Sequence, residues 1–140
     1  MTDTISDIIQ GIVPIEQKDL SLLLEIGYFY LELQKFKEAE EIFNGVAALI
    51  PHSEIPHIAL GHLYFSQGHF NPALKANKAA VLLNTESAPA HAAVGEVLFF
   101  LKKPDDAVTA LNKAIQCSPE SPAAEFAQAL LHANEVGVFG

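Results

Sequence analysis

The fold is decided by three segments, Leu23-x-x-Ile26-Gly27-x-x-Tyr30, His57-x-x-Leu60-Gly61-x-x-Tyr64 and His91-x-x-Val94-Gly95-x-x-Leu98. Their glycines stand 34 residues apart, and the segments align without a gap. The same step relates two further columns, which are Ala39, Ala73 and Ala107, and then Pro51, Thr85 and Pro119. Three columns in one register indicate a repeated supersecondary unit that stacks on its own copies.

The small residues in these columns have a steric explanation. Two antiparallel helices that cross at short range need a side chain of minimal volume at the crossing. Glycine within a helix costs about 1 kcal/mol relative to alanine, so Gly27 and its equivalents point to a packing role that recovers this cost. Each repeat is therefore expected to be a hairpin of two helices.

The prolines mark where these helices begin and end, because proline is tolerated in the first turn of a helix or beyond its end. Helix starts are expected at Pro56, Pro72, Pro89 and Pro122, with Ser53, Asn71, Ser87 and Ser121 as capping residues. The predicted helices cover about 19–34, 37–50, 54–67, 71–83, 88–101, 105–117 and 122–135.

Composition bounds the function. The 140 residues suffice for one domain, and the net charge of -9 repels phosphate backbones and anionic lipid. We therefore expect neither nucleic acid nor a membrane as a partner. No apolar run reaches the length that spans a bilayer, and the single cysteine, Cys117, excludes an internal disulfide. A soluble cytoplasmic protein is expected.

The repeat columns resemble the tetratricopeptide repeat (TPR), which carries a small residue in its first helix, an alanine in its second and a proline at its exit. The resemblance implies an all-α, right-handed superhelix. It divides the chain into an N-terminal amphipathic segment (1–18), three repeats (19–121, as 20–53, 54–87 and 88–121), and a capping helix with a tail (122–140). The middle repeat departs most from the pattern, with Asn77 where Phe43 and Leu111 stand in the others.

The first helices of the repeats carry a second stripe beside the packing stripe, and in the family's superhelix that stripe lines the concave surface. The predicted peptide-binding residues are Leu24, Tyr28, Leu31, Ile58, His62, Phe65, Ala92, Glu96 and Phe99. The first helices of repeats one and two are apolar over nearly twice the arc that a core needs. Either neighbouring helices and a terminal segment cover this excess, or an exposed groove accepts an amphipathic helix or extended peptide. Lysine and arginine are missing from the stripe, which disfavours a clamp for carboxylates.

The N-terminal segment repeats isoleucine and valine at helical spacing, which predicts one short amphipathic N-terminal helix before Pro14. It could fold over the first repeat, pair with its twin in a homodimer, or remain mobile. The last predicted helix carries Glu125, Gln128 and His132 along one side, as a helix that shields an open end of the core should.

No group of residues indicates chemistry. His57 and His62 stand five residues apart, not the four that place two metal ligands on one helical face. Cys117 has no basic neighbour to activate it, and the run Glu38, Glu40 and Glu41 belongs to a solvated helix face. We expect no metal, no cofactor and no enzymatic activity.

Among short TPR proteins the chain resembles the chaperones of bacterial type III secretion systems. The resemblance rests on length, acidity, the apolar N-terminal segment, and the stretches from Gly27 to Phe43 and from Ala90 to Ala93. It implies a partner in the bacterial cytoplasm that is a needle or translocator subunit, with a small co-chaperone or a homodimer as further possibilities. A continuous apolar groove would favour a helical cargo over an extended one. A general scaffold that joins partners in a larger assembly is the alternative.

Overall fold

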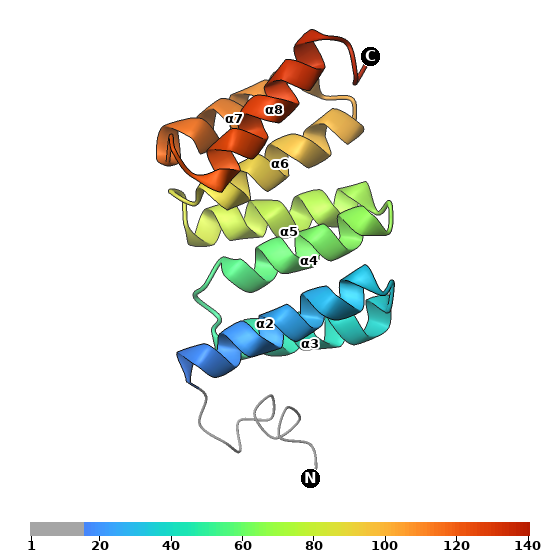
Figure 1. Cartoon of the computed structure of the whole chain (residues 1–140), viewed down its shortest axis with the longest axis vertical. Coiled ribbons are helices and arrows are strands. Elements are labelled where there is room, and N and C mark those ends of the chain that lie inside the picture. The colour runs from blue at the N-terminus through green and yellow to red at the C-terminus, as the bar shows by residue number, and fades with distance from the viewer. Residues whose placement is uncertain (1–15) are drawn as a thin grey trace.

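The computed structural model describes residues 16–140, and every regular element in this range is a helix (Figure 1). The helices are α2 (Gln17–Glu32), α3 (Phe36–Leu49), α4 (Ile55–Ser66), α5 (Phe70–Leu83), α6 (Ala88–Phe100), α7 (Pro104–Cys117) and α8 (Pro122–Glu135). All seven predicted helices are confirmed, with ends within three residues of the expected ones.

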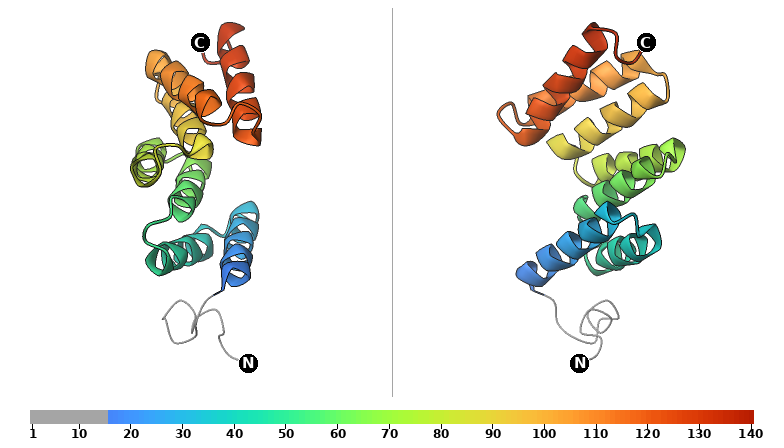
Figure 2. Two further views of the ribbon diagram at one scale, coloured as in Figure 1. Left: turned by 90° about the vertical axis from the view of Figure 1, so that its left-hand side faces the viewer. Right: turned by 45° about the vertical axis from the view of Figure 1, so that its right-hand side comes forward.

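The helices form antiparallel pairs, α2 with α3, α4 with α5, and α6 with α7, and α8 follows as an unpaired last helix (Figures 1 and 2). The first helices of successive pairs also touch, since α4 contacts both α2 and α6, and α6 contacts α8. Each second helix packs against the first helix of the next pair. The repeated hairpins therefore build a stack in which α2, α4, α6 and α8 form one continuous layer.

The repeat glycines lie where the paired helices cross. A methyl group added to Gly27 would overlap the ring of Phe43, one added to Gly61 would overlap the amide of Asn77, and one added to Gly95 would lie 2.6 Å from Leu111. The alanines of the second helices, Ala39, Ala73 and Ala107, have no exposed surface. The steric explanation of both columns is confirmed.

Capping follows the sequence in part. Ser87 and Ser121 cap α6 and α8 by accepting hydrogen bonds from the backbone N–H of Ala90 and Ala124. The prediction that Asn71 caps α5 is wrong, because α5 begins at Phe70 and Asn71 lies in its first turn. Ser53 stands before the N-cap of α4 and accepts from the N–H of Ile55 at 3.2 Å.

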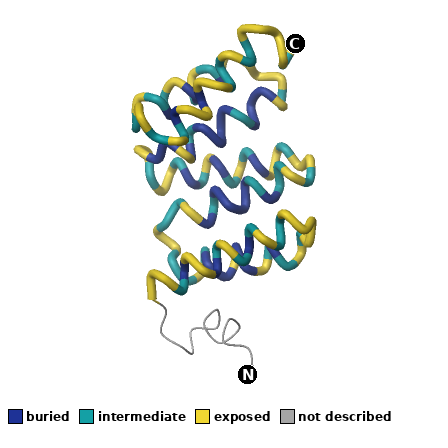
Figure 3. Tube along the Cα trace, viewed as in Figure 1, coloured by how far each residue is buried: buried dark blue, intermediate teal, exposed yellow. Residues whose placement is uncertain are grey.

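The core runs along the seams between helices (Figure 3). α6 is the most deeply buried helix because α5, α7 and α8 all pack against it. On α8 the side chains of Glu125, Gln128 and His132 are exposed, as predicted for a helix that ends the stack. Most of the predicted N-terminal segment, residues 1–15, lies outside the described residues.

Candidate functional site

The predicted binding stripe lies on α2, α4 and α6. Tyr28 of α2 and His62 of α4 stand one repeat apart, and a hydrogen bond of 2.9 Å joins the Tyr28 hydroxyl to Nδ1 of His62. Their rings lie 5.8 Å apart. The two side chains thus tie the first repeat to the second on the face where the sequence places the groove.

A pocket of about 530 Å³ opens beside this contact. Tyr28, Ile58 and His62 are among the residues that line it, and we call it the concave pocket. Residues of the turns before α4, α6 and α8 surround it, namely Glu54, Ile55, Glu86, Ser87, Ala88, Pro89, Ser118 and Ser121. Asn84 donates to the Glu54 carboxylate at 2.9 Å and fixes part of this rim. The pocket joins all three repeats.

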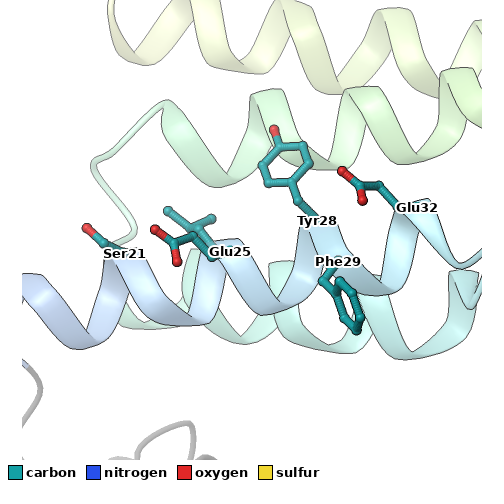
Figure 4. Close-up of a pocket in the computed structure, with 6 residues that line it drawn as sticks. Ser21, Glu25, Tyr28, Phe29 and Glu32 are labelled. Carbon is teal, nitrogen blue, oxygen red and sulfur yellow. The ribbon is translucent and has the colours of Figure 1, made fainter.

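A second, shallower hollow of about 500 Å³ runs along α2 (Figure 4). Leu24 and Tyr28 of the predicted stripe line it together with Ser21, Glu25, Phe29 and Glu32. Tyr28 points towards α4, whereas Phe29 points to the opposite side (Figure 4) and is 58% exposed. Phe29 is absent from the predicted stripe because it lies one position beyond Tyr28.

Ile58, Ala92 and Phe99 are buried, so they present little surface to a partner in this state. Ile58 packs with Ala80 and Ala90 between the second and third repeats, and Ala92 belongs to the same core cluster as Phe99. The other six predicted residues, Leu24, Tyr28, Leu31, His62, Phe65 and Glu96, are partly exposed. The accessible part of the stripe is therefore concentrated on α2 and α4.

Desolvation dominates the electrostatics of this face. Burial raises the pKa of Tyr28 to about 12 and lowers the pKa of His62 below its usual value of 6.5. Burial also raises the pKa of Glu96. All three shifts favour the neutral form, as an apolar environment requires. Neither α4 nor α6 contains a lysine or arginine, so these helices offer no cation to an acidic ligand.

Five phenylalanines form a cluster at the edge where the paired helices turn. Its members, which we call the aromatic cluster, are Phe65, Phe70, Phe99, Phe100 and Phe139. Phe65 and Phe99 belong to the predicted stripe, whereas Phe139 lies beyond the last helix, where the repeat pattern predicts no position for it. Phe139 stacks on Phe99, which explains in part why Phe99 is buried.

A further pocket, of about 640 Å³, lies away from the stripe. It is formed by α4 and α5, with His57, Leu60 and Tyr64 on one side and Pro72, Lys75 and Ala76 on the other. His57 is thus partly exposed and not only a packing residue. This second surface is relevant to the scaffold alternative.

The residues considered for chemistry have structural surroundings. Within residues 16–140 no three metal-ligating side chains come together. Burial, together with the Glu86 carboxylate, raises the pKa of the Cys117 thiol against the opposing effect of Lys113, which lowers the thiolate fraction and hence the reactivity of the thiol. The expectation that Cys117 has no basic neighbour is wrong, because Lys113 lies close enough to act on it. Glu40 is half-buried and accepts a hydrogen bond of 2.8 Å from the Tyr64 hydroxyl, so the expectation that it is fully solvated is wrong.

The family comparison matches a tetratricopeptide repeat model to residues 20–52, which span α2 and α3. Two further hairpins follow with the same 34-residue step, the same glycine crossings and the same pairing. The chain has the tetratricopeptide repeat fold. A search of the curated protein sequences finds no matching relative.

Solved TPR structures resemble the whole of the described stack. SycD, a type III secretion translocator chaperone of Yersinia enterocolitica, is 14% identical, with a TM-score of 0.76 over 91% of this chain and 96% of SycD. PcrH, in complex with the chaperone binding region of PopB, is 21% identical, with a TM-score of 0.71 over 85% of this chain and 96% of PcrH. The first TPR of Spaghetti, bound to the HSP90 peptide SRMEEVD, is 22% identical, with a TM-score of 0.67 over 84% of this chain and 97% of that chain. At these identities the likeness establishes a common TPR fold.

No helix within residues 16–140 has the length and hydropathy to cross a bilayer.

Proposed function

We propose that this TPR protein is a chaperone that holds an apolar or amphipathic segment of a secreted type III secretion subunit against α2 and α4 in the bacterial cytoplasm. The observation that carries the proposal is the concave pocket, whose lining is largely apolar and includes the desolvated side chains of Tyr28 and His62. A segment that buries its own apolar side chains there would gain roughly 1.5 to 3 kcal/mol for each large anchor, before ordering costs.

The chemistry of the stripe favours an apolar ligand over an acidic peptide. The Spaghetti TPR binds a peptide that ends in Glu-Glu-Val-Asp. Recognition of such a peptide calls for lysine or arginine along the groove to pair with the carboxylates. Here α4 and α6 carry neither, and Glu96 adds a carboxyl group of its own. We therefore place this chain with binders of apolar segments.

Between the two classes of subunit we propose a translocator. PcrH has been solved with the chaperone binding regions of PopB and PopD, and SycD is described as a translocator chaperone. The buried Ile58, Ala92 and Phe99 interrupt the accessible part of the stripe. This supports an extended segment over a helix, which would need a continuous apolar groove. A needle subunit remains the second candidate of this class.

The proposal is tested by co-purification from the native organism with identification of the bound chain by mass spectrometry. The native protein should capture a secreted subunit, and the variant Tyr28→Glu with Phe65→Glu should lose it while its helical content is unchanged. Leu82→Glu is the matched control, because Leu82 is 83% exposed on α5, away from the stripe. Capture that survives the double variant and fails with Leu82→Glu would move the site to α5.

The scaffold alternative is favoured by the pocket between α4 and α5, which offers a second surface. Partner stability separates the two functions. A chaperone's cargo should aggregate or be degraded in cells that lack this protein, whereas the partners of a scaffold should persist but separate.

A further inference from the structure

The chain places one of its own side chains on the third repeat. The ring of Phe139 lies parallel to that of Phe99, with 4.3 Å between the ring centroids and an angle of 2° between the planes. It also meets Phe100 edge-on at 5.9 Å. Phe99 occupies the same repeat position as Leu31 and Phe65, so Phe139 covers the third-repeat member of the predicted stripe.

A sharp turn after α8 brings Phe139 back to this position. Gly137 adopts a left-handed conformation with φ +86°, its N–H donates to the carbonyl of Asn134, and the N–H of Val138 donates to the carbonyl of Ala133. This is the hydrogen-bond pattern by which a helix ends at a glycine. The segment then runs beside α6 on the side of the α6–α7 turn (Figures 1 and 2).

A single ring anchors this segment. Val136 and Val138 are about two-thirds exposed. Gly137 and Gly140 have positive φ, and a methyl group added to either of them would meet no neighbouring atom within 4 Å. Among residues 136–140, Phe139 is the one that packs against the third-repeat core cluster. A short, glycine-containing segment held by one side chain opens at low cost, because few contacts have to be broken.

Phe100, the second ring that Phe139 meets, belongs to an open aromatic surface. Phe100 is 43% exposed and touches Phe65 at 4.9 Å and Phe70 at 5.4 Å, so the cluster extends from the third repeat to the second. Offset-stacked and edge-on contacts of this kind are specific to planar rings. The surface exposed by moving Phe139 would therefore select an aromatic side chain over an aliphatic one.

We propose that Phe139 is an internal ligand: it fills an aromatic-binding subsite on Phe99 and Phe100, and an aromatic side chain of the bound polypeptide replaces it. The inference rests on the proposed function for the identity of that polypeptide, and on the geometry of the segment 136–140 for the subsite itself. When Phe139 occupies the subsite, Phe99 is kept from water in the free protein. Only molecules in which Phe139 has left the subsite can bind an aromatic side chain there, so the apparent affinity for cargo falls in proportion to their fraction.

The subsite is tested without any cargo by adding the acetylated peptide Glu-Val-Gly-Val-Phe-Gly, which copies residues 135–140, to full-length variants. The readout is the backbone amide shifts of Phe99 and Phe100 in 15N NMR spectra. In Phe139→Ala these amides should shift saturably, and in the native protein the apparent affinity should be at least about threefold weaker because Phe139 competes. The same peptide with alanine or leucine for phenylalanine should give much smaller shifts. Val138→Ala, which keeps the ring, should behave like the native chain.

A second variant guards against a general loss of structure. Gly137→Ala leaves the ring in place but strains the turn, since alanine adopts a positive φ at a cost. Its affinity for the peptide should lie between those of the native protein and Phe139→Ala. Equal affinity in all variants, or no response from a folded Phe139→Ala, would show that Phe139 is a fixed part of the core and overturn the proposal.

The cargo arm distinguishes this inference from the proposed function. Phe139→Ala should bind the captured subunit about three- to thirtyfold more tightly than Val138→Ala. If the native chain captures no subunit, the proposed function fails while the peptide titration still decides the subsite. If a subunit is captured and both variants bind it equally, the displacement of Phe139 by cargo is wrong.

Discussion

Asn77→Leu should stabilise the protein. Asn77 is 1% exposed at the crossing of α4 and α5, and its Oδ1 atom has no hydrogen-bond partner. Its equivalents in the other repeats, Phe43 and Leu111, are fully buried against Gly27 and Gly95. The third repeat thus shows that a leucine fits against a glycine at this crossing.

The magnitude follows from two gains and one cost. Removing a buried acceptor without a partner recovers about 1 to 3 kcal/mol, and the added apolar surface contributes roughly 1 kcal/mol. Leucine is larger than asparagine, and strain from overpacking takes back about 1 to 2 kcal/mol. We expect a net gain of about 1 to 2 kcal/mol, which raises the melting temperature by roughly 3 to 8 °C for a domain of this size.

Urea and thermal unfolding followed by far-ultraviolet circular dichroism measure this gain. The reciprocal variant Leu111→Asn is the matched control, and it should lose about 3 to 5 kcal/mol because it removes a buried leucine and adds a buried amide. If Asn77→Leu leaves the unfolding midpoint unchanged or lowers it while Leu111→Asn behaves as expected, the Asn77 amide is satisfied in solution and the reasoning is refuted.

Three further predictions concern stability. Lys102 has φ 61° in the α6–α7 turn, at the position where the α4–α5 turn has Gly68. Lys102→Gly should therefore raise the free energy of unfolding, measured in urea, by about 0.5 to 1 kcal/mol. A decrease would show that the lysine side chain stabilises the turn. Ser87→Ala removes the cap of α6 and should lower the free energy of unfolding by about 1 kcal/mol. Ser66→Ala should lower it less, because the Ser66 hydroxyl only donates to a carbonyl within α4. Equal losses in the two variants would contradict the capping role of Ser87. His62 has a lowered pKa in the folded state, so the unfolded chain binds its proton first and stability is lost as the pH falls below about 6.5. His62→Gln should make the fall in unfolding free energy between about pH 7.5 and 5.5 shallower, and an identical slope in both proteins would exclude His62 as its source.

The repeat made the helices predictable because each one is set by features that recur in the sequence. The glycine and alanine columns fix which faces cross, and the prolines and Ser87 fix where helices begin. Asn71 failed as a cap because α5 starts one residue earlier, at Phe70, without any side-chain cap. Asparagine is a residue type that favours helix caps, but the turn before α5 sets the start of the helix one residue earlier.

The accessible surface could not be read from one repeat, because it depends on contacts between repeats. Ile58 lies on the predicted stripe, yet Ala80 and Ala90 of the neighbouring helices cover it. Phe99 is buried because Phe139 folds back on it from beyond the last helix, where the 34-residue register no longer applies. The periodic pattern identifies the face and leaves open which of its residues a partner can reach.

The central claim is that another polypeptide binds to the face formed by α2 and α4. Photo-crosslinking from single positions tests it most directly, with a photoreactive amino acid placed at Leu24 on this face and, in a separate protein, at the exposed Leu82 on α5. Illumination in the native organism should attach a secreted subunit to position 24 and not to position 82. A subunit attached only through position 82 would contradict it.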